Sequence, residues 1–342
     1  MSSVPVAALR ALLTARLADL HARHLPVDEA RLARYYRSGR GYYPPEEAGA
    51  ERDTFAVCVA TVRGQLIGVG DQDVPFPLQS ISKVFAYALA LTDHRREDVL
   101  ARVGVEPSGD PFNSIEFDDR HRRPYNPMVN AGALVTTDLV RGASPERKME
   151  RILELVRAYA GDDTVDVDEQ TLARELRGAD LNRATAYLMR SAGMLDADVE
   201  ELLALYLRQC SIRVTCAQLA VMAATLANGC VNPQTGVRTL PQRRVRDLLS
   251  VMYTCGMYDA AGEWAYDIGV PAKSGVSGGI LAVVPGKLGI AVYSPGLDAE
   301  GNSVRGVSVC REISERLGLH VFASESEDQI LGPAAAVADR YS

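Results

Sequence analysis

The sequence predicts an α/β (α+β) fold in which an antiparallel sheet, flanked by helices, lies beside an all-helical lobe. Strand-like segments occur near residues 54–71 and again at 278–296, whereas helical periodicity dominates about 127–260 between them. A sheet assembled from the N- and C-terminal segments, with a helical insertion beside it, lets each element bury its apolar face. No internal repeat is evident, so we expect one α/β unit.

The first elements are a helix, a hairpin and a second helix. Residues 5–38 have helical periodicity with a break at HLPVDEA. The segment 54–71 contains two apolar runs around an Arg-Gly turn, which is typical of a β-hairpin. Prolines in PFPL (75–78) block a helix before Gln79, and residues 80–94 then have helical spacing.

The middle of the chain is predicted to be mostly helical, and strands return after it. Helical periodicity occurs in 130–142, 144–161, 167–193, 198–212 and 216–229. Glycine and proline bound two consecutive strands at 278–286 and 287–296. Residues 301–319 indicate a strand or loop that leads into a terminal helix.

These elements predict an N-terminal helical segment (1–40), a single domain (41–320) and a C-terminal tail (321–342). The helical lobe of the domain would cover about 120–260. We expect the active cleft where the sheet and the helical lobe meet.

Composition excludes several classes of protein. The 342 residues are 47% hydrophobic, enough for a sizeable core, and the net charge of −7 argues against nucleic acid as a partner. No apolar run reaches the roughly 18–20 residues that a membrane span needs. Arg10 and Arg16 interrupt the apolar face of the N-terminal segment, which therefore does not resemble a secretory signal. We expect a cytoplasmic protein.

The six cysteines do not indicate a metal site. No pair has C-x-x-C spacing, and the five histidines form no cluster with them. We expect most of the cysteines to be small buried hydrophobic residues in a reducing compartment, and we expect no metal or organic cofactor.

The candidate catalytic motif is Ser80-x-x-Lys83. On a helix these positions share one face, so the lysine amine could accept the serine proton and create a nucleophile. The alternative is an ordinary helix start, in which Ser80 or Ser82 caps the helix and Lys83 is a solvated charge.

The rarity of lysine favours the catalytic interpretation. Only four of the 37 basic residues are lysine, and arginine cannot lose its proton near neutral pH. One of the four, Lys273, begins a Lys-Ser-Gly motif (273–275) before an apolar strand. Serine β-lactamases and penicillin-binding proteins have S-x-x-K at a helix start facing K-[ST]-G on a strand edge.

Several longer blocks resemble the serine-dependent glutaminase family in collinear order, from about Tyr42 to about residue 317. They include FPLQSISKVF, YNPMVNAGALVTTDL, CSIRVTCAQLAVMAATLANG and MYTCGMYDAAGEWAYDIGVPAKSGVSGG. The resemblance implies a β-lactamase/transpeptidase-like fold, hydrolysis of L-glutamine to L-glutamate and ammonia, no cofactor, and a homo-oligomer, either a dimer or a tetramer.

The resemblance also implies the site residues. Ser80 is the nucleophile and Lys83 its base, and the backbone N–H groups of Ser80 and Val276 form the oxyanion hole. Tyr42 matches a family tyrosine, with Tyr43 as the alternative. The resemblance implies substrate binding by Asn130, Glu175, Asn182, Tyr206 and Tyr258, and support from Lys273, Ser274 and Gly275. Tyr258 or Lys83 would donate a proton to departing ammonia.

Taken singly, several of these residues also have ordinary interpretations. Asn130 would be a helix cap, Glu175 a surface residue and Tyr206 a core residue. Two other functions compete with the glutaminase: a β-lactam-acting enzyme, which lacks support because no Ser-Asp-Asn occurs, and a non-catalytic glutamine sensor, which would not need Ser80 and Lys83.

Overall fold

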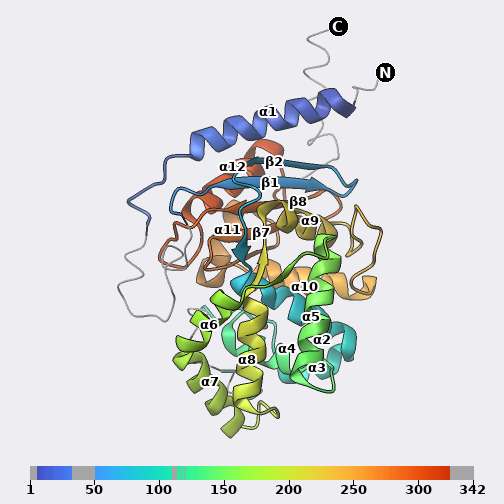
Figure 1. Cartoon of the computed structure of the whole chain (residues 1–342), viewed down its shortest axis with the longest axis vertical. Coiled ribbons are helices and arrows are strands. Elements are labelled where there is room, and N and C mark those ends of the chain that lie inside the picture. The colour runs from blue at the N-terminus through green and yellow to red at the C-terminus, as the bar shows by residue number, and fades with distance from the viewer. Residues whose placement is uncertain (1–5, 33–50, 110–113, 116, 119, 324–342) are drawn as a thin grey trace.

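The computed structural model describes residues 6–32, 51–109, 114–115, 117–118 and 120–323. A five-stranded antiparallel sheet in the order β2-β1-β8-β7-β6 is assembled from both ends of this region (Figure 1). Its strands are β1 (Ala56–Thr61), β2 (Leu66–Gly70), β6 (Ala272–Ser274), β7 (Gly279–Val284) and β8 (Leu288–Tyr293). The predicted hairpin and the two predicted C-terminal strands are thereby confirmed.

The antiparallel pairing of β1 with β8 joins the N-terminal and C-terminal parts of the sheet directly. Ala56 pairs with Tyr293 at one end of β1, and Thr61 pairs with Leu288 at the other. Every residue of β7 and β8 is buried, because both faces of the sheet are covered. Strands buried on both faces become continuous apolar runs, which explains the GILAVV and LGIAVY sequences.

Helices cover the two faces of the sheet. On one face, α1 (Val6–His24), α11 (Ala261–Asp267) and α12 (Val304–Leu317) pack with alternate strand residues into one core cluster. On the other face, α9 (Cys216–Ala227) packs against β1, β7 and β8. The N terminus of α9 is fixed by a capping box in which Thr215 and Gln218 exchange hydrogen bonds.

The remaining helices form the lobe below the sheet in Figure 1. They are α2 (Lys83–Asp93), α3 (Arg96–Arg102), α4 (Asn130–Asp138), α5 (Pro145–Ala160), α6 (Glu169–Arg177), α7 (Asp180–Ser191), α8 (Val199–Cys210) and α10 (Gln242–Cys255). The helical block predicted over 167–193 is two helices, because α6 ends at Arg177 and Gly178 follows. The N-terminal helix α1 ends at His24, within the predicted break.

A second sheet, with three strands, was not predicted from the sequence. It consists of β3 (Phe76–Pro77), β5 (Ile212–Val214) and β4 (Asp166–Val167), in that order. Next to it, the backbone N–H of Leu78 donates to the Ile212 carbonyl at 2.7 Å. This small sheet therefore fixes the chain two residues before Ser80.

All six cysteines are buried and free, as predicted. No helix in the described part of the chain is long and apolar enough to cross a membrane. Among the same residues, no group of three or more His, Cys, Asp or Glu side chains could hold a metal ion.

Candidate active site

The Ser80-x-x-Lys83 motif lies where a short 3₁₀ turn, η2 (Gln79–Ser82), continues into α2. Lys83 Nζ donates to Ser80 Oγ at 2.9 Å, so the spacing brings the two groups together as expected. Lys83 is 0% exposed, which is incompatible with a solvated surface charge. Neither η2 nor α2 has a side-chain cap hydrogen bond, so these serines do not act as helix caps.

Burial adapts Lys83 to accept a proton. It lowers the pKa of Lys83 to about 8, because the buried ammonium loses its hydration. A substantial fraction of the side chain is then the neutral amine at pH near 8, which an exposed lysine would not be. This geometry is that of a general base beside a hydroxyl nucleophile.

Asn130 joins the lysine to two further side chains of the lobe. Its Oδ1 accepts from Lys83 Nζ at 2.7 Å and from the Tyr206 hydroxyl at 3.3 Å. Its Nδ2 donates to Asn182 Oδ1 at 2.8 Å. Asn130 is the first residue of α4, whose N-cap is Val129. It is instead the centre of a buried polar network.

Glu175 contacts the turn that carries Ser80 through Gln79, which was not among the predicted site residues. Gln79 Nε2 donates to Glu175 Oε1 at 2.8 Å. Gln79 has φ of 50°, a left-handed conformation that costs a non-glycine residue energy and is often found at functional sites. Burial raises the pKa of Glu175, although the Gln79 hydrogen bond opposes that rise. The only sequence signal for Gln79 was its position directly before Ser80.

The Lys-Ser-Gly motif occupies the end of β6 and the residue after it, and faces the turn that carries Ser80. Gly275 packs so closely that a Cβ there would lie 2.7 Å from the Leu78 carbonyl oxygen. Val276 follows at the strand end, and its backbone N–H has no acceptor among the described residues. The Val276 N–H thus lies one residue beyond the glycine that packs against the turn carrying Ser80.

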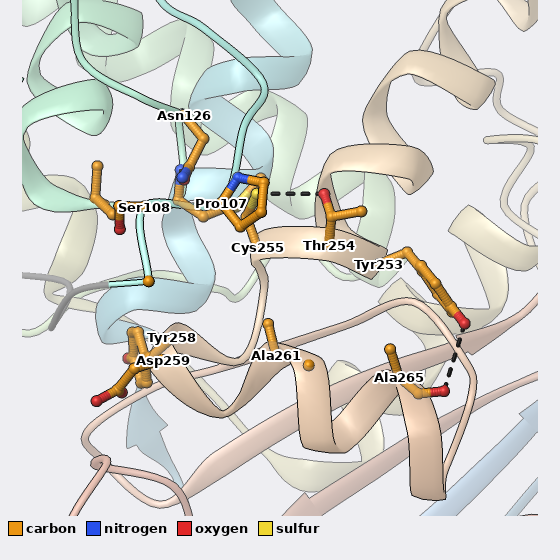
Figure 2. A pocket seen from close by; sticks show the side chains of 14 residues that line it. Pro107, Ser108, Asn126, Tyr253, Thr254, Cys255, Tyr258, Asp259, Ala261 and Ala265 are labelled. Carbon is orange, nitrogen blue, oxygen red and sulfur yellow. Dashed lines mark hydrogen bonds between the residues drawn. The ribbon is translucent and has the colours of Figure 1, made fainter. Parts of the chain in front are cut away.

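Tyr258 lies on the same side, in the short turn η3 (Tyr258–Ala260) after α10. Its hydroxyl donates to the Ser274 carbonyl at 3.1 Å, and its φ is 59°. Tyr258 also lines a pocket of about 400 Å³ (Figure 2). In that view Pro107 and Ser108 lie on one side of the pocket and Tyr258, Ala261 and Ala265 on the other.

The structure therefore brings the predicted residues into one region between the sheet and the lobe. Ser80, Lys83, Asn130, Asn182 and Tyr206 form a connected hydrogen-bond network. Glu175 joins through Gln79, and Tyr258 joins the strand that carries Lys273 and Ser274 and is followed by Gly275. Tyr42 and its alternative Tyr43 lie outside the described residues.

Replacing Gly275 with alanine is expected to reduce turnover roughly 10- to 100-fold, because small misplacements of catalytic groups are costly. The added Cβ would collide with the Leu78 backbone and move Val276 away from Ser80. Gly262→Ala is the matched control, since a Cβ at Gly262 meets nothing within 4 Å. Steady-state kinetics of both variants test this prediction. Equal kcat values for Gly275→Ala and Gly262→Ala would contradict a catalytic effect of the close packing at Gly275.

Comparison with known proteins gives one consistent family. A model of the Glutaminase family matches residues 41–322. A glutaminase from Trichormus variabilis is 54% identical over 304 residues, covering 89% of this chain and 88% of that protein.

Solved structures agree in fold. A structure of a probable glutaminase has a TM-score of 0.83 at 38% identity and covers 91% of this chain and 98% of its own. A structure of Mglu in its glutamate form has a TM-score of 0.81 at 40% identity. The match covers 95% of this chain and 72% of the Mglu chain. The bacterial glutaminases have the β-lactamase-like fold, so the predicted fold class is confirmed.

Proposed function

The chain belongs to the glutaminase family, and on that premise we propose that it hydrolyses the side-chain amide of L-glutamine through an acyl-enzyme on Ser80. The products are L-glutamate and ammonia, so the enzyme acts on a linear amide C–N bond. The observation that carries the mechanism is the buried contact of 2.9 Å between Lys83 Nζ and Ser80 Oγ.

Acylation begins when the neutral amine of Lys83 accepts the Ser80 proton and Oγ attacks the amide carbon. The backbone N–H groups of Ser80 and Val276 stabilise the oxyanion, and one such donor is commonly worth about 3–4 kcal/mol. The C–N bond then breaks, and the leaving nitrogen takes a proton from Lys83 or Tyr258 to depart as ammonia. Water, activated by the same groups, hydrolyses the γ-glutamyl ester. No metal or organic cofactor takes part.

The lobe side of the site suits the zwitterionic end of glutamine. Glu175 receives the α-ammonium, since a carboxylate is the strongest acceptor for that cation. Asn130, Asn182 and Tyr206 offer neutral polar groups to the α-carboxylate end, and their mutual hydrogen bonds hold them in place. Tyr42 is proposed to complete the catalytic group, by its position in the family motif.

We further propose a cytoplasmic homo-oligomer, a dimer or a tetramer. Analytical ultracentrifugation of the full chain tests the assembly, and a purely monomeric sedimentation profile would reject it.

Substrate profiling tests the proposed function against its nearest rivals. Purified protein should release ammonia from L-glutamine and leave a chromogenic β-lactam intact. Hydrolysis of the β-lactam would favour the transpeptidase-like alternative. Saturable glutamine binding without ammonia release would favour a sensor.

Glu175→Gln is expected to raise KM for glutamine roughly 10- to 100-fold, with a smaller change in kcat, because a hydrogen bond to a charged group is worth about 1.5–3 kcal/mol. The variant keeps an oxygen acceptor for Gln79 and removes only the charge that pairs with the α-ammonium. Glu169→Gln on the same helix is the control, since Glu169 is exposed and pairs with Arg208. An unchanged KM in Glu175→Gln would reject the assignment.

A further inference from the structure

A buried thiol contacts the hydrogen-bond network of the site and has no part in the mechanism above. It belongs to Cys210, the last residue of α8, which is 4% exposed. We infer that Cys210 is a positioning residue, whose thiol proton holds the Tyr206 hydroxyl in the direction that donates to Asn130. Asn130 in turn holds Lys83. This inference rests on the proposed function, because it assigns a residue that acts on the catalytic base through two others.

Helix geometry and packing place the thiol beside the base. Cys210 follows Tyr206 by four residues on α8, so the two side chains share one face of the helix and hydrogen-bond to each other. Ser82 Oγ donates to Cys210 Sγ at 3.6 Å, which places the sulfur against the turn that carries Ser80. Cys210 and Lys83 also act on each other electrostatically, as neighbours do. The thiol thus connects α8 to the start of the helix that carries the base.

Counting protons gives the direction of the bond between Cys210 and Tyr206. The Tyr206 hydroxyl has one proton, and it donates that proton to Asn130 Oδ1 at 3.3 Å. An amide oxygen is a stronger acceptor than a thiol sulfur, so the phenol proton does not go to Cys210. The Tyr206 oxygen must therefore accept, and the thiol must donate. Both side chains are buried, so solvent does not compete for this weak donor.

The direction of this bond matters at Asn130. Its Oδ1 has two lone pairs, one for the Tyr206 hydroxyl and one for Lys83 Nζ at 2.7 Å. With both filled, the amide oxygen fixes one N–H of Lys83 and holds the nitrogen 2.9 Å from Ser80 Oγ. The neutral amine then has its lone pair available for the Ser80 proton. A Tyr206 hydroxyl that turned away would leave Asn130 with one donor fewer and Lys83 less restrained.

The thiol must keep its proton for this function, and its surroundings ensure that it does. Burial raises the pKa of Cys210 to about 11, although Lys83 and the Ser82 hydrogen bond oppose the rise. Glu175 acts in the same direction as burial, because its negative charge disfavours a thiolate. Burial also raises the pKa of Tyr206 well above its usual value. Near pH 8, where Lys83 loses its proton, the thiol and the phenol are both neutral donors.

The test compares Cys210→Ala with Cys210→Ser. The two side chains are almost equal in volume, but serine has a hydroxyl that can donate to Tyr206 and alanine has no donor. We expect kcat for glutamine to fall about 5- to 10-fold in Cys210→Ala, the loss typical of one neutral hydrogen bond. In Cys210→Ser it should stay within about twofold of wild type, because the donor is restored. Lost packing alone would affect both variants alike.

Cys310→Ala is the matched control for the loss of a buried thiol. Cys310 is 1% exposed, in the core cluster between the sheet and α12. Among the described residues its thiol has no hydrogen-bond partner, and burial alone raises its pKa. We therefore expect kcat of Cys310→Ala to equal that of wild type, while its melting temperature falls about as far as that of Cys210→Ala.

Labelling of Ser80 by a fluorophosphonate separates this inference from the glutaminase assignment. The labelling rate depends on Lys83 as the base and needs no glutamine. It should fall in Cys210→Ala and recover in Cys210→Ser by the same factors as kcat. This pattern in a protein whose wild type does not turn over glutamine would support the function of Cys210 and reject the glutaminase.

Equal labelling rates in Cys210→Ala and Cys210→Ser, whether both unchanged or both reduced, would overturn the inference. The thiol would then act through packing or not at all, and wild-type glutamine turnover would leave the glutaminase assignment intact. If circular dichroism shows that Cys210→Ala does not fold, Cys210→Val takes its place, since valine fills the space without a donor. A Cys210→Val protein labelled as fast as Cys210→Ser would likewise reject the hydrogen bond as the cause.

Discussion

Ser80→Ala is expected to lower kcat for glutamine by roughly 10⁴- to 10⁶-fold, the loss typical when a nucleophile is removed from a serine hydrolase. The substitution deletes one oxygen atom from a buried turn and leaves the Lys83–Asn130 hydrogen bond of 2.7 Å intact. The melting temperature should therefore change little. Ammonia release, measured beside thermal unfolding, distinguishes lost chemistry from lost structure.

Ser82→Ala is the matched control for Ser80→Ala. Ser82 is buried two residues away in the same turn, and its hydroxyl donates to Cys210 Sγ at 3.6 Å. Among the described residues, Lys83 Nζ donates to Ser80 and Asn130 and not to Ser82. We therefore expect kcat of Ser82→Ala to stay within a few-fold of wild type. Residual turnover above about 1% in Ser80→Ala, or an equal loss in both variants, would contradict the assignment of the nucleophile.

Lys83→Arg is expected to lower kcat/KM at least about 10³-fold, near the upper range for loss of a general base. Arginine keeps the positive charge but cannot give it up near neutral pH, so it cannot accept the Ser80 proton. In wild type, kcat/KM should rise with pH through about 8, where Lys83 loses its proton. The arginine enzyme should show no such limb in a full pH profile.

Lys148→Arg provides the comparison for that prediction. Lys148 Nζ donates to the Asp138 carbonyl at 2.8 Å and lies near its carboxylate, so its charge suffices there. Activity close to wild type is therefore expected. If Lys83→Arg were equally active, a permanent cation would be enough at position 83, and the general-base mechanism would be wrong.

Long periodic elements were predictable because their pattern is local. The hairpin at 54–71, the helix after Ser80 and the strands at 278–296 each contain their own signal in consecutive residues. The small sheet was not predictable, since β3 and β4 have two residues each and β5 has three. Segments this short have no periodicity, and only tertiary pairing creates them.

In the site, too, local contacts could be predicted from the sequence and long-range contacts could not. The i, i+3 spacing of Ser80 and Lys83 predicted their contact, because helix geometry determines it. The Asn130–Asn182 and Gln79–Glu175 contacts join residues 52 and 96 positions apart, and no local pattern links them. Only the family resemblance pointed to Asn130, Asn182 and Glu175. The left-handed backbone of Tyr258 had no glycine to indicate it.

The pairing of β1 with β8 has a consequence for how this protein is made. Ala56 must meet Tyr293, so the ribosome synthesises Ser80 long before the strands that complete the sheet. Such distant contacts close slowly, because loop-closure entropy is lost before they form. During synthesis the chain thus carries Ser80 and Lys83 before the segment with Val276 exists, so under the proposed mechanism we expect no glutamine hydrolysis until the last strands emerge. We therefore expect catalytic competence late in translation, and an inert polypeptide when a ribosome stalls before β6.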